Sequence, residues 1–403
     1  MSAPGEDQAV RPGSLRTLFV VCVIDVLGFG VLIPLVPYMA HRYGATPTVI
    51  TAVMGSYSLC QLLAAPLWGR LSDRHGRRPI LLSSLAGACA SYVLLGLVDN
   101  LGGVLFARML AGFMAGNLAA AFAYASDVSA PEARARSMGM VGAAIGIGFM
   151  LGMPIGGTLA GNDAQGANFL RPALLSACLS VVAMLLVKLR LPESRVRSRA
   201  AEQEAGRAAR PLQLLRARPA LLLICAGALL ITTAQGMLES IFALWALDRF
   251  GFGPRTVGYA LFGAALVAVL MQGGGVRALA PRLGEARLAL FGACAYAAGL
   301  LAVAATGSGL AGTAVGLALC GAGMGAFGPS ASALASRQSR SGDRGAVMGT
   351  YQAGTSLARV IGPFAAGPLY SLLGSNAPFI AGACLALPAA WLVWRSRRVG
   401  SGL

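Results

Sequence analysis

The chain has 403 residues, of which 56% are hydrophobic and only 12% are charged, and it carries 54 glycines. Because about 25% of the residues in a soluble globular domain are charged, this composition excludes an ordinary soluble protein and indicates a polytopic membrane protein. A net charge of +17 would suggest nucleic-acid binding in a soluble chain. Here the distribution of the basic residues along the chain gives another explanation.

Apolar runs long enough to cross a bilayer as helices, which takes about 20 residues, recur along the whole chain. The sequence predicts twelve spans, at residues 16–40, 48–69, 79–98, 101–127, 135–160, 170–191, 218–247, 254–278, 286–306, 308–335, 345–371 and 373–395. Irregular backbone is barred from lipid, so each span is expected to be helical.

Most basic residues fall in the segments that alternating spans assign to one side of the membrane. The exceptions are two arginines within spans and four on the other side: Arg108, Arg359, Arg42, Arg171, Arg249 and Arg255. The positive-inside rule then places both termini in the cytoplasm, and the expected location is the bacterial inner (plasma) membrane. The positive net charge thus reflects the orientation of the chain in the membrane, and no nucleic-acid partner is expected.

The eight cysteines lie singly within predicted spans, with no CxxC pair and no histidine at ligand spacing. They are interpreted as small core residues rather than disulfides or metal ligands, so no metal is expected. The sequence shows no P-loop and no nucleophile and base set. An enzyme and a transporter driven by ATP hydrolysis are therefore disfavoured. No cofactor is expected, and the expected energy source is a proton gradient.

One long polar segment, rich in Arg, Glu and Ala, divides the spans into two sets of six. The expected parts are a cytoplasmic tail, a six-helix bundle, a cytoplasmic linker, a second six-helix bundle and a short tail, at residues 1–15, 16–191, 192–217, 218–397 and 398–403. The halves also repeat, since Arg134 and Met138-Gly139 match Arg344 and Met348-Gly349 at an offset of 210. The expected fold is all-α, with two pseudo-symmetric bundles and a midplane site between them.

Four motifs accompany the spans. They are Gly69-x-Leu-x-Asp73-Arg74-x-Gly76-Arg77-Arg78 after span 2, Asp25-x-x-Gly28-x-Gly30-x-x-x-Pro34-x-x-Pro37 in span 1, Arg108-x-x-x-Gly112-x-x-x-Gly116 in span 4, and Gly148-x-x-x-Gly152-Met-Pro154-x-Gly156-Gly157 in span 5. With the twelve spans and the linker, they resemble the major facilitator superfamily over nearly the whole chain. Within it they resemble the twelve-span drug:proton antiporter group, which includes the tetracycline-efflux proteins.

The segment 69–79 carries four arginines and one aspartate between two apolar runs. Each charge would cost about 2.5–3.5 kcal/mol or more in the bilayer core, so we expect a tight loop at a membrane surface. Gly69 and Gly76 permit a close turn, and Arg77 can bind a carboxylate with two hydrogen bonds, for which Asp127 is a second candidate besides Asp73.

The resemblance implies that this loop latches the two bundles when the site faces outward, with Asp73 meeting the start of span 11 near Asp343. The expected latch residues are Gly69, Asp73, Arg74, Gly76, Arg77, Arg78 and Asp127. The second half keeps basic residues and Gly284 but lacks the aspartate, so the latch is expected to be one-sided. A topology signal without a switching role is the alternative.

Asp25 and Arg108 lie deep within predicted spans and are expected to pair across the first bundle. The functional interpretation is a proton or cationic-substrate site at Asp25 tuned by Arg108, and the alternative is a static ion pair. Glu239 in span 7 is an entry-side cation contact or a side chain that only reaches solvent. Possible cavity residues are Gln61, Asn117 and Gln235.

Small residues at helical spacing predict close helix packing in spans 4 and 5. The expected packing and gating residues are Gly112, Gly116, Gly148, Gly152, Pro154, Gly156, Gly157, Arg359, Gly362 and Pro363. Exchangers of the resembled family carry Gly-Pro in span 5. In this chain Pro154 falls one position later, which leaves antiport or symport open.

The expected function is a proton-coupled secondary transporter that exports small amphipathic organic compounds, of drug or tetracycline type, by alternating access. A symporter or facilitator for a sugar or metabolite is the alternative. A receptor or scaffold without transport is less favoured, because it has no evident use for buried Asp25 and Arg108. The expected partners are the small-molecule substrate and the lipid bilayer, with the chain as a monomer.

Overall fold

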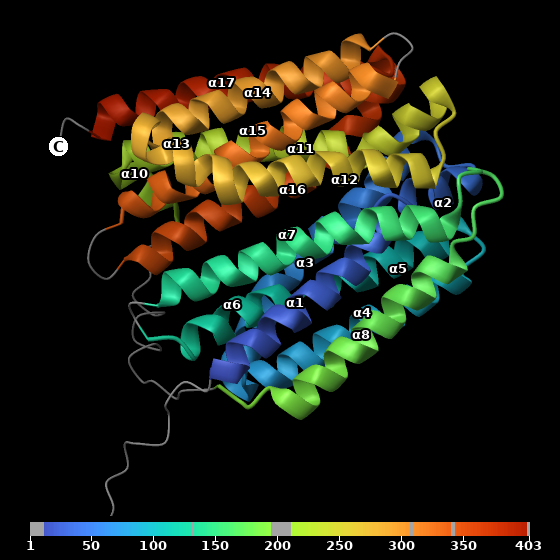
Figure 1. Cartoon of the computed structure of the whole chain (residues 1–403), viewed down its shortest axis with the longest axis horizontal. Coiled ribbons are helices and arrows are strands. Elements are labelled where there is room, and N and C mark those ends of the chain that lie inside the picture. The colour runs from blue at the N-terminus through green and yellow to red at the C-terminus, as the bar shows by residue number, and fades with distance from the viewer. Residues whose placement is uncertain (1–11, 131–132, 195–210, 307–309, 340–342, 401–403) are drawn as a thin grey trace, which may run out of the picture. The chain divides into compact units, whose positions relative to one another are not determined.

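The computed structural model describes residues 12–130, 133–194, 211–306, 310–339 and 343–400, and within these ranges its regular elements are all helices (Figure 1). Most of the predicted N-terminal tail and linker, and the end of the C-terminal tail, lie outside the described residues. The helices are α1 (Pro12–Leu32), α2 (Val36–Arg42), α3 (Pro47–His75), α4 (Arg77–Leu97), α5 (Leu101–Phe113), α6 (Asn117–Asp127), α7 (Arg134–Ala160), α8 (Leu170–Arg190), α10 (Pro211–Ala217), α11 (Pro219–Phe250), α12 (Pro254–Leu270), the π-helix η1 (Met271–Gly275), α13 (Val276–Leu283), α14 (Glu285–Ala305), α15 (Leu310–Arg337), α16 (Arg344–Leu373) and α17 (Ala377–Gly400).

Eleven helical stretches among the described residues are long and apolar enough to cross a membrane. The twelfth predicted span is α16, which has 30 residues but is less apolar because it carries Arg359 and several hydroxyl and amide side chains. Two predicted spans are interrupted. Span 1 breaks between α1 and α2, and span 4 breaks between α5 and α6.

The contacts within the chain define two compact units. The first is Met1–Leu35, Leu59–Ala160 and Asn168–Arg197, and the second is Val36–Ser58, Gly161–Ala167 and Ser198–Leu403. Residues 36–58 and 161–167, which the sequence assigns to the first bundle, group with the second unit. Within that unit, the Tyr38 hydroxyl donates to the Phe252 carbonyl oxygen at 2.6 Å.

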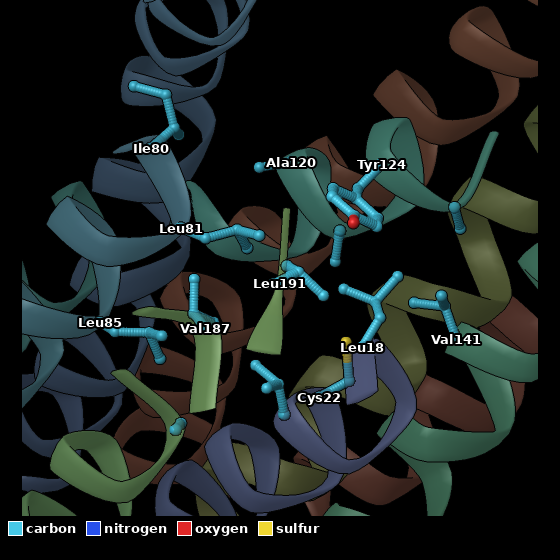
Figure 2. Packing of buried hydrophobic residues seen from close by; sticks show 14 of the residues in the cluster. Leu18, Cys22, Ile80, Leu81, Leu85, Ala120, Tyr124, Val141, Val187 and Leu191 are labelled. Atoms are coloured by element: carbon cyan, nitrogen blue, oxygen red, sulfur yellow. The ribbon is translucent and has the colours of Figure 1, made fainter. Parts of the chain in front are cut away.

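The core of the first unit is an apolar cluster between α1, α4, α6, α7 and α8 (Figure 2). Leu18, Leu81, Tyr124, Val141 and Val187 are each 2% exposed or less. Burying such side chains stabilises the unit by about 25 cal/mol per Å² of apolar surface.

In the second unit α11 is the central helix, and Trp245 is its largest fully buried side chain. The indole Nε1 donates to Asn376 Oδ1 at 2.9 Å, and the ring packs edge-on against Phe379. Glycines let α14 and α15 approach backbone to backbone, because a Cβ at Gly292 would lie 2.7 Å from the Gly323 carbonyl oxygen.

The helices α1 and α7 pack so closely that their contact requires glycine. A Cβ at Gly148 would lie 2.8 Å from the Val23 carbonyl oxygen, and one at Gly152 would lie within 2.8 Å of Val31 N. Gly156 meets the Val31 carbonyl in the same way. This contact fixes α1, and therefore Asp25, against the rest of the first unit.

The two units repeat one turn at equivalent positions. Gly76 precedes α4 with φ +104°, and Gly284, 208 residues later, precedes α14 with φ +76°. A residue with a side chain is strained at such angles, which explains glycine at both places. An ion pair follows each turn but with opposite polarity: Arg77 Nε binds Asp127 Oδ2 at 3.0 Å, and Glu285 Oε1 binds Arg337 Nη2 at 2.5 Å. The second unit lacks the aspartate, as predicted, but it carries an ion pair of opposite polarity after its own glycine turn.

Gly152→Val should lower the free energy of unfolding by about 1–3 kcal/mol, because the added side chain forces α7 away from α1. Thermal unfolding in detergent would measure this as a lower Tm. The matched control is Gly142→Val on the same helix, since a Cβ at Gly142 meets nothing within 4 Å. Equal Tm changes in the two variants would contradict the packing account.

Glu285→Arg and Arg337→Glu should each lower Tm, because each places two like charges side by side. The cost is no more than about 1 kcal/mol, since Arg337 is 67% exposed. The double variant restores opposite charges with the polarity of the first unit and should recover most of the lost Tm. A double variant as unstable as the two single changes added together would show that the pair does not stabilise the unit.

Candidate functional site

The charged segment after span 2 is carried on helix ends and not on a loop. The helix α3 runs to His75 and α4 begins at Arg77, so Gly76 alone separates them. The expectation of a tight surface loop is thus corrected to a one-residue turn. Gly69 lies inside α3 and a Cβ there would meet nothing within 4 Å, so the turn does not depend on it.

Arg77 joins three polar groups of the first unit. Its Nη1 donates to Asp73 Oδ1 at 2.6 Å and to Ser72 Oγ at 3.0 Å, and its Nε donates to Asp127 Oδ2 at 3.0 Å. The Asp127 side chain is 24% exposed, whereas that of Asp73 is 71% exposed. Arg77 therefore links the end of α3, the start of α4 and the end of α6.

Glu193, which follows span 6, completes this cluster and was missed from the sequence. Its carboxylate accepts the backbone N–H groups of Arg77 at 2.8 Å and Arg78 at 3.2 Å, which start α4. A carboxylate at a helix N-terminus is favourable because the helix dipole is positive there. The available signal was an acid directly after a span that ends on the same predicted side as the charged segment.

Two of the three other arginines of the segment, Arg74 and Arg78, differ in their surroundings. Arg74 is exposed. Arg78 Nη2 donates to the Lys188 carbonyl oxygen at 2.5 Å, which ties the start of α4 to the end of α8. In the second unit Asp343 is ion-paired with Arg218, so the start of α16 is bound to the start of α11. The predicted contact of Asp73 with the start of span 11 would join the two units and stays a prediction.

Asp25 on α1 is a buried acid, with 7% exposure. Its Oδ2 accepts a hydrogen bond from Asn117 Nδ2 on α6. The pair borders a small cavity that is otherwise apolar and is lined by Val21, Cys22, Leu81, Leu85, Leu118 and Ala121.

Arg108 does not take the place that the sequence predicted. It is 4% exposed, and its guanidinium carbon lies 5.7 Å from the centroid of the Phe29 ring, an arrangement that suits a cation–π contact. Asn117, predicted only as a possible cavity residue, is the side chain that reaches Asp25. The expected pair of Asp25 and Arg108 is thus corrected to a pair of Asp25 and Asn117.

Span 4 departs from the continuous glycine face that its i, i+4 spacing predicted. The helix ends at Phe113 and restarts at Asn117, so Gly112 lies in α5 whereas Gly116 directly precedes α6. Gly116 packs against the indole of Trp68, because a Cβ there would lie 2.5 Å from the ring atom Cγ. Irregular backbone at membrane depth is tolerated where protein groups satisfy it, as Trp68 and Ser84 do for the Phe113 and Met114 carbonyl oxygens.

A second polar group lies on α11 in the second unit. Gln235 Nε2 donates to Glu239 Oε1 at 2.7 Å, and Arg359 on α16 lies within electrostatic range of Glu239. Glu239 is exposed. One turn beyond Arg359, Gly362 approaches Gly236 so closely that a Cβ would lie 2.9 Å from its Cα.

The remaining predicted residues lie on helices without further polar contacts of note. Gln61 is half-buried on α3, Gly157 is buried on α7, and α7 continues through Pro154 as α16 does through Pro363. No cluster of three or more His, Cys, Asp or Glu side chains that could hold a metal occurs in the described part of the chain.

A larger cavity of about 770 Å³ lies in the second unit, along α12 and α15, and was not predicted. Its wall combines apolar side chains with a few polar ones: Asn162, Arg255, Thr256, Tyr259, Ala260, Gly263, Ala264, Leu266, Val267, Thr313, Ala314 and Ala318. That volume and lining are typical of small-molecule sites.

Comparisons with known proteins agree with this architecture. The family model described as Major Facilitator Superfamily matches residues 18–311 and 276–402. The chain is similar to the class G tetracycline resistance protein of Vibrio anguillarum, with 30% identity over 90% of this chain and 91% of the relative. It is also similar to multidrug resistance protein 2 of Bacillus subtilis (strain 168), with 25% identity over 89% and 90%.

Solved structures share the fold. One is the human organic anion transporter MFSD10 (TETRAN), with TM-score 0.71, 24% identity and coverage of 94% of this chain and 99% of that one. Another is a bacterial homolog of the human lysosomal transporter Spinster in an inward-facing conformation, with TM-score 0.77, 15% identity and coverage of 96% and 98%. The chain therefore belongs to the major facilitator superfamily and is an integral membrane transporter, not an enzyme.

Proposed function

We propose that the chain is a proton-coupled antiporter that exports small amphipathic organic compounds of the tetracycline type. The observation that carries the proposal is Asp25, an acid buried on a membrane-spanning helix with one amide donor beside it. Ionisable residues within spans are costly and mark ion or substrate paths in membrane proteins. A carboxyl that exchanges a proton there couples the proton gradient to transport.

The substrate class is supported by the relatives and by the cavity. Several relatives that align with most of this chain are named tetracycline resistance proteins. The cavity along α12 and α15, with a volume of about 770 Å³, has room for a small organic molecule and offers Arg255 and Tyr259 within an apolar wall. An amphipathic organic molecule matches such a lining.

The chain acts as a monomer in the bacterial inner membrane with both termini in the cytoplasm, and the proton gradient is its energy source. Arg77 with Asp73 and Asp127 holds the helix ends on one side while the bundles rock. Glu239 with Arg359 is the second candidate for contact with a charged substrate group.

Asp25→Asn should abolish tetracycline-driven proton movement while leaving the chain folded. An asparagine at this position keeps an oxygen that accepts the Asn117 hydrogen bond, but it has no exchangeable acid proton. The measurement is the fluorescence of a pH probe in inverted membrane vesicles after tetracycline is added to an imposed pH gradient.

The control is Asp99→Asn, an exposed acid just before α5, which should behave as wild type. Unchanged proton movement in Asp25→Asn would remove Asp25 from the coupling step. Substrate flux in the wild type that ignores the proton gradient would overturn the antiporter as a whole.

A further inference from the structure

We propose that Asn117, presented by the break in span 4, is the positioning residue that holds Asp25 in its ionised form in this conformation. The inference rests on the proposed role of Asp25 in proton exchange. It concerns how the protein controls the charge of that acid.

The break is built by side chains from neighbouring helices. Trp68 Nε1 on α3 donates to the Phe113 carbonyl oxygen at 2.5 Å, and Ser84 Oγ on α4 donates to the Met114 carbonyl oxygen. The same Ser84 Oγ accepts the Asn117 backbone N–H at 3.0 Å. These bonds satisfy backbone groups that the interrupted helix exposes, and so they fix the position of Asn117.

The Asn117 amide has a defined orientation. Its Oδ1 accepts the Leu118 backbone N–H at 3.0 Å, which leaves Nδ2 to face Asp25. Asn117 therefore offers Asp25 a donor and not an acceptor. A donor bonds more strongly to a carboxylate than to a protonated acid, because the bond to the ion is charge-assisted.

The position of Asn117 at the start of α6 acts in the same direction. The first residue of an 11-residue helix lies at the positive end of the helix dipole, which favours a nearby anion. The donor amide and the dipole thus together favour the ionised acid.

The other elements packed around Asp25 add few charges. The cavity beside it brings the Cys22 thiol from its own helix and Leu81 and Leu85 from α4. The helix α7 presents glycines to α1, and α8 presents Ser176, whose Oγ donates to the Gly28 carbonyl oxygen at 2.7 Å. Arg108 of α5 lies against Phe29, one turn further along α1.

A movement of α6 relative to α1 would then change the charge of Asp25. With the Asn117 donor in place, the acid releases its proton. With the donor withdrawn, the carboxylate in its apolar cavity has lost its hydrogen bond and takes up a proton. The break in span 4 therefore links the conformation of the first unit to proton binding.

Asn117→Ala should move the pH midpoint of Asp25 protonation upward by about one unit, which is the effect of losing one charge-assisted hydrogen bond. The direct readout is an infrared pH titration of the purified chain in liposomes, using the protonated carboxyl band that is absent from Asp25→Asn. The pH profile of tetracycline-driven proton movement should shift in the same direction.

Two further variants keep the test decisive. Asn117→Leu keeps a side chain of similar size without an N–H donor, so it should give the same upward shift if Asn117→Ala does not fold. Asn100→Ala is the matched control, because Asn100 caps α5 through the Gly103 N–H at 2.8 Å and lies at the far end of that half of span 4. It should lower stability without moving the midpoint.

A wild-type midpoint in both Asn117 variants would overturn the inference even if transport is proton-driven. An upward shift in the infrared titration supports it even if the wild type shows no tetracycline-driven proton movement, since that result would refute only the proposed function. A midpoint that moves equally in Asn100→Ala would show a general effect of instability and would also overturn it.

Discussion

An acid buried inside a membrane protein needs protein groups in place of its hydration, and in the first unit Asn117 donates a hydrogen bond to Asp25. The hydrogen bond from Asn117 depends on the break in span 4, which Ser84 and Trp68 stabilise from two other helices. The close glycine contact of α1 with α7 holds the other partner in place. The buried acid, the interrupted helix and the glycine contact thus lie on neighbouring helices of the first unit.

Charged residues at the helix ends are also bound to protein groups. Arg77 bridges Asp73 and Asp127, while Glu193 accepts the first backbone N–H groups of α4. The second unit repeats the glycine turn but inverts the ion pair between Glu285 and Arg337. The internal repeat keeps an ion pair between two helix ends, whereas the acid and the base have exchanged positions. Pairs of this kind contribute little stability individually, and their value lies in the geometry they fix.

The sequence predicted the helical class, the spans and the family, because these depend on the length of the apolar runs and on motifs whose residues lie close together along the chain. It failed where a contact joins residues far apart. Opposite charge favours a pair of Arg108 with Asp25, but the partner of Asp25 is the neutral amide of Asn117. Asn117 reaches Asp25 because span 4 breaks before it, whereas the spacing of Gly112 and Gly116 predicts a continuous helix. The sequence alone does not indicate the pair of Glu285 with Arg337, because its polarity is opposite to that of the first unit, nor the role of Glu193, because this acid lies in a polar segment far from Arg77 along the chain.

In the proposed antiport, tetracycline binding drives the release of the Asp25 proton. The most direct measurement of this coupling is proton release from the purified chain when tetracycline binds, followed with a pH indicator in weakly buffered detergent solution. The account predicts proton release by the wild type and none by Asp25→Asn at equal tetracycline occupancy. Equal release from both proteins would contradict it.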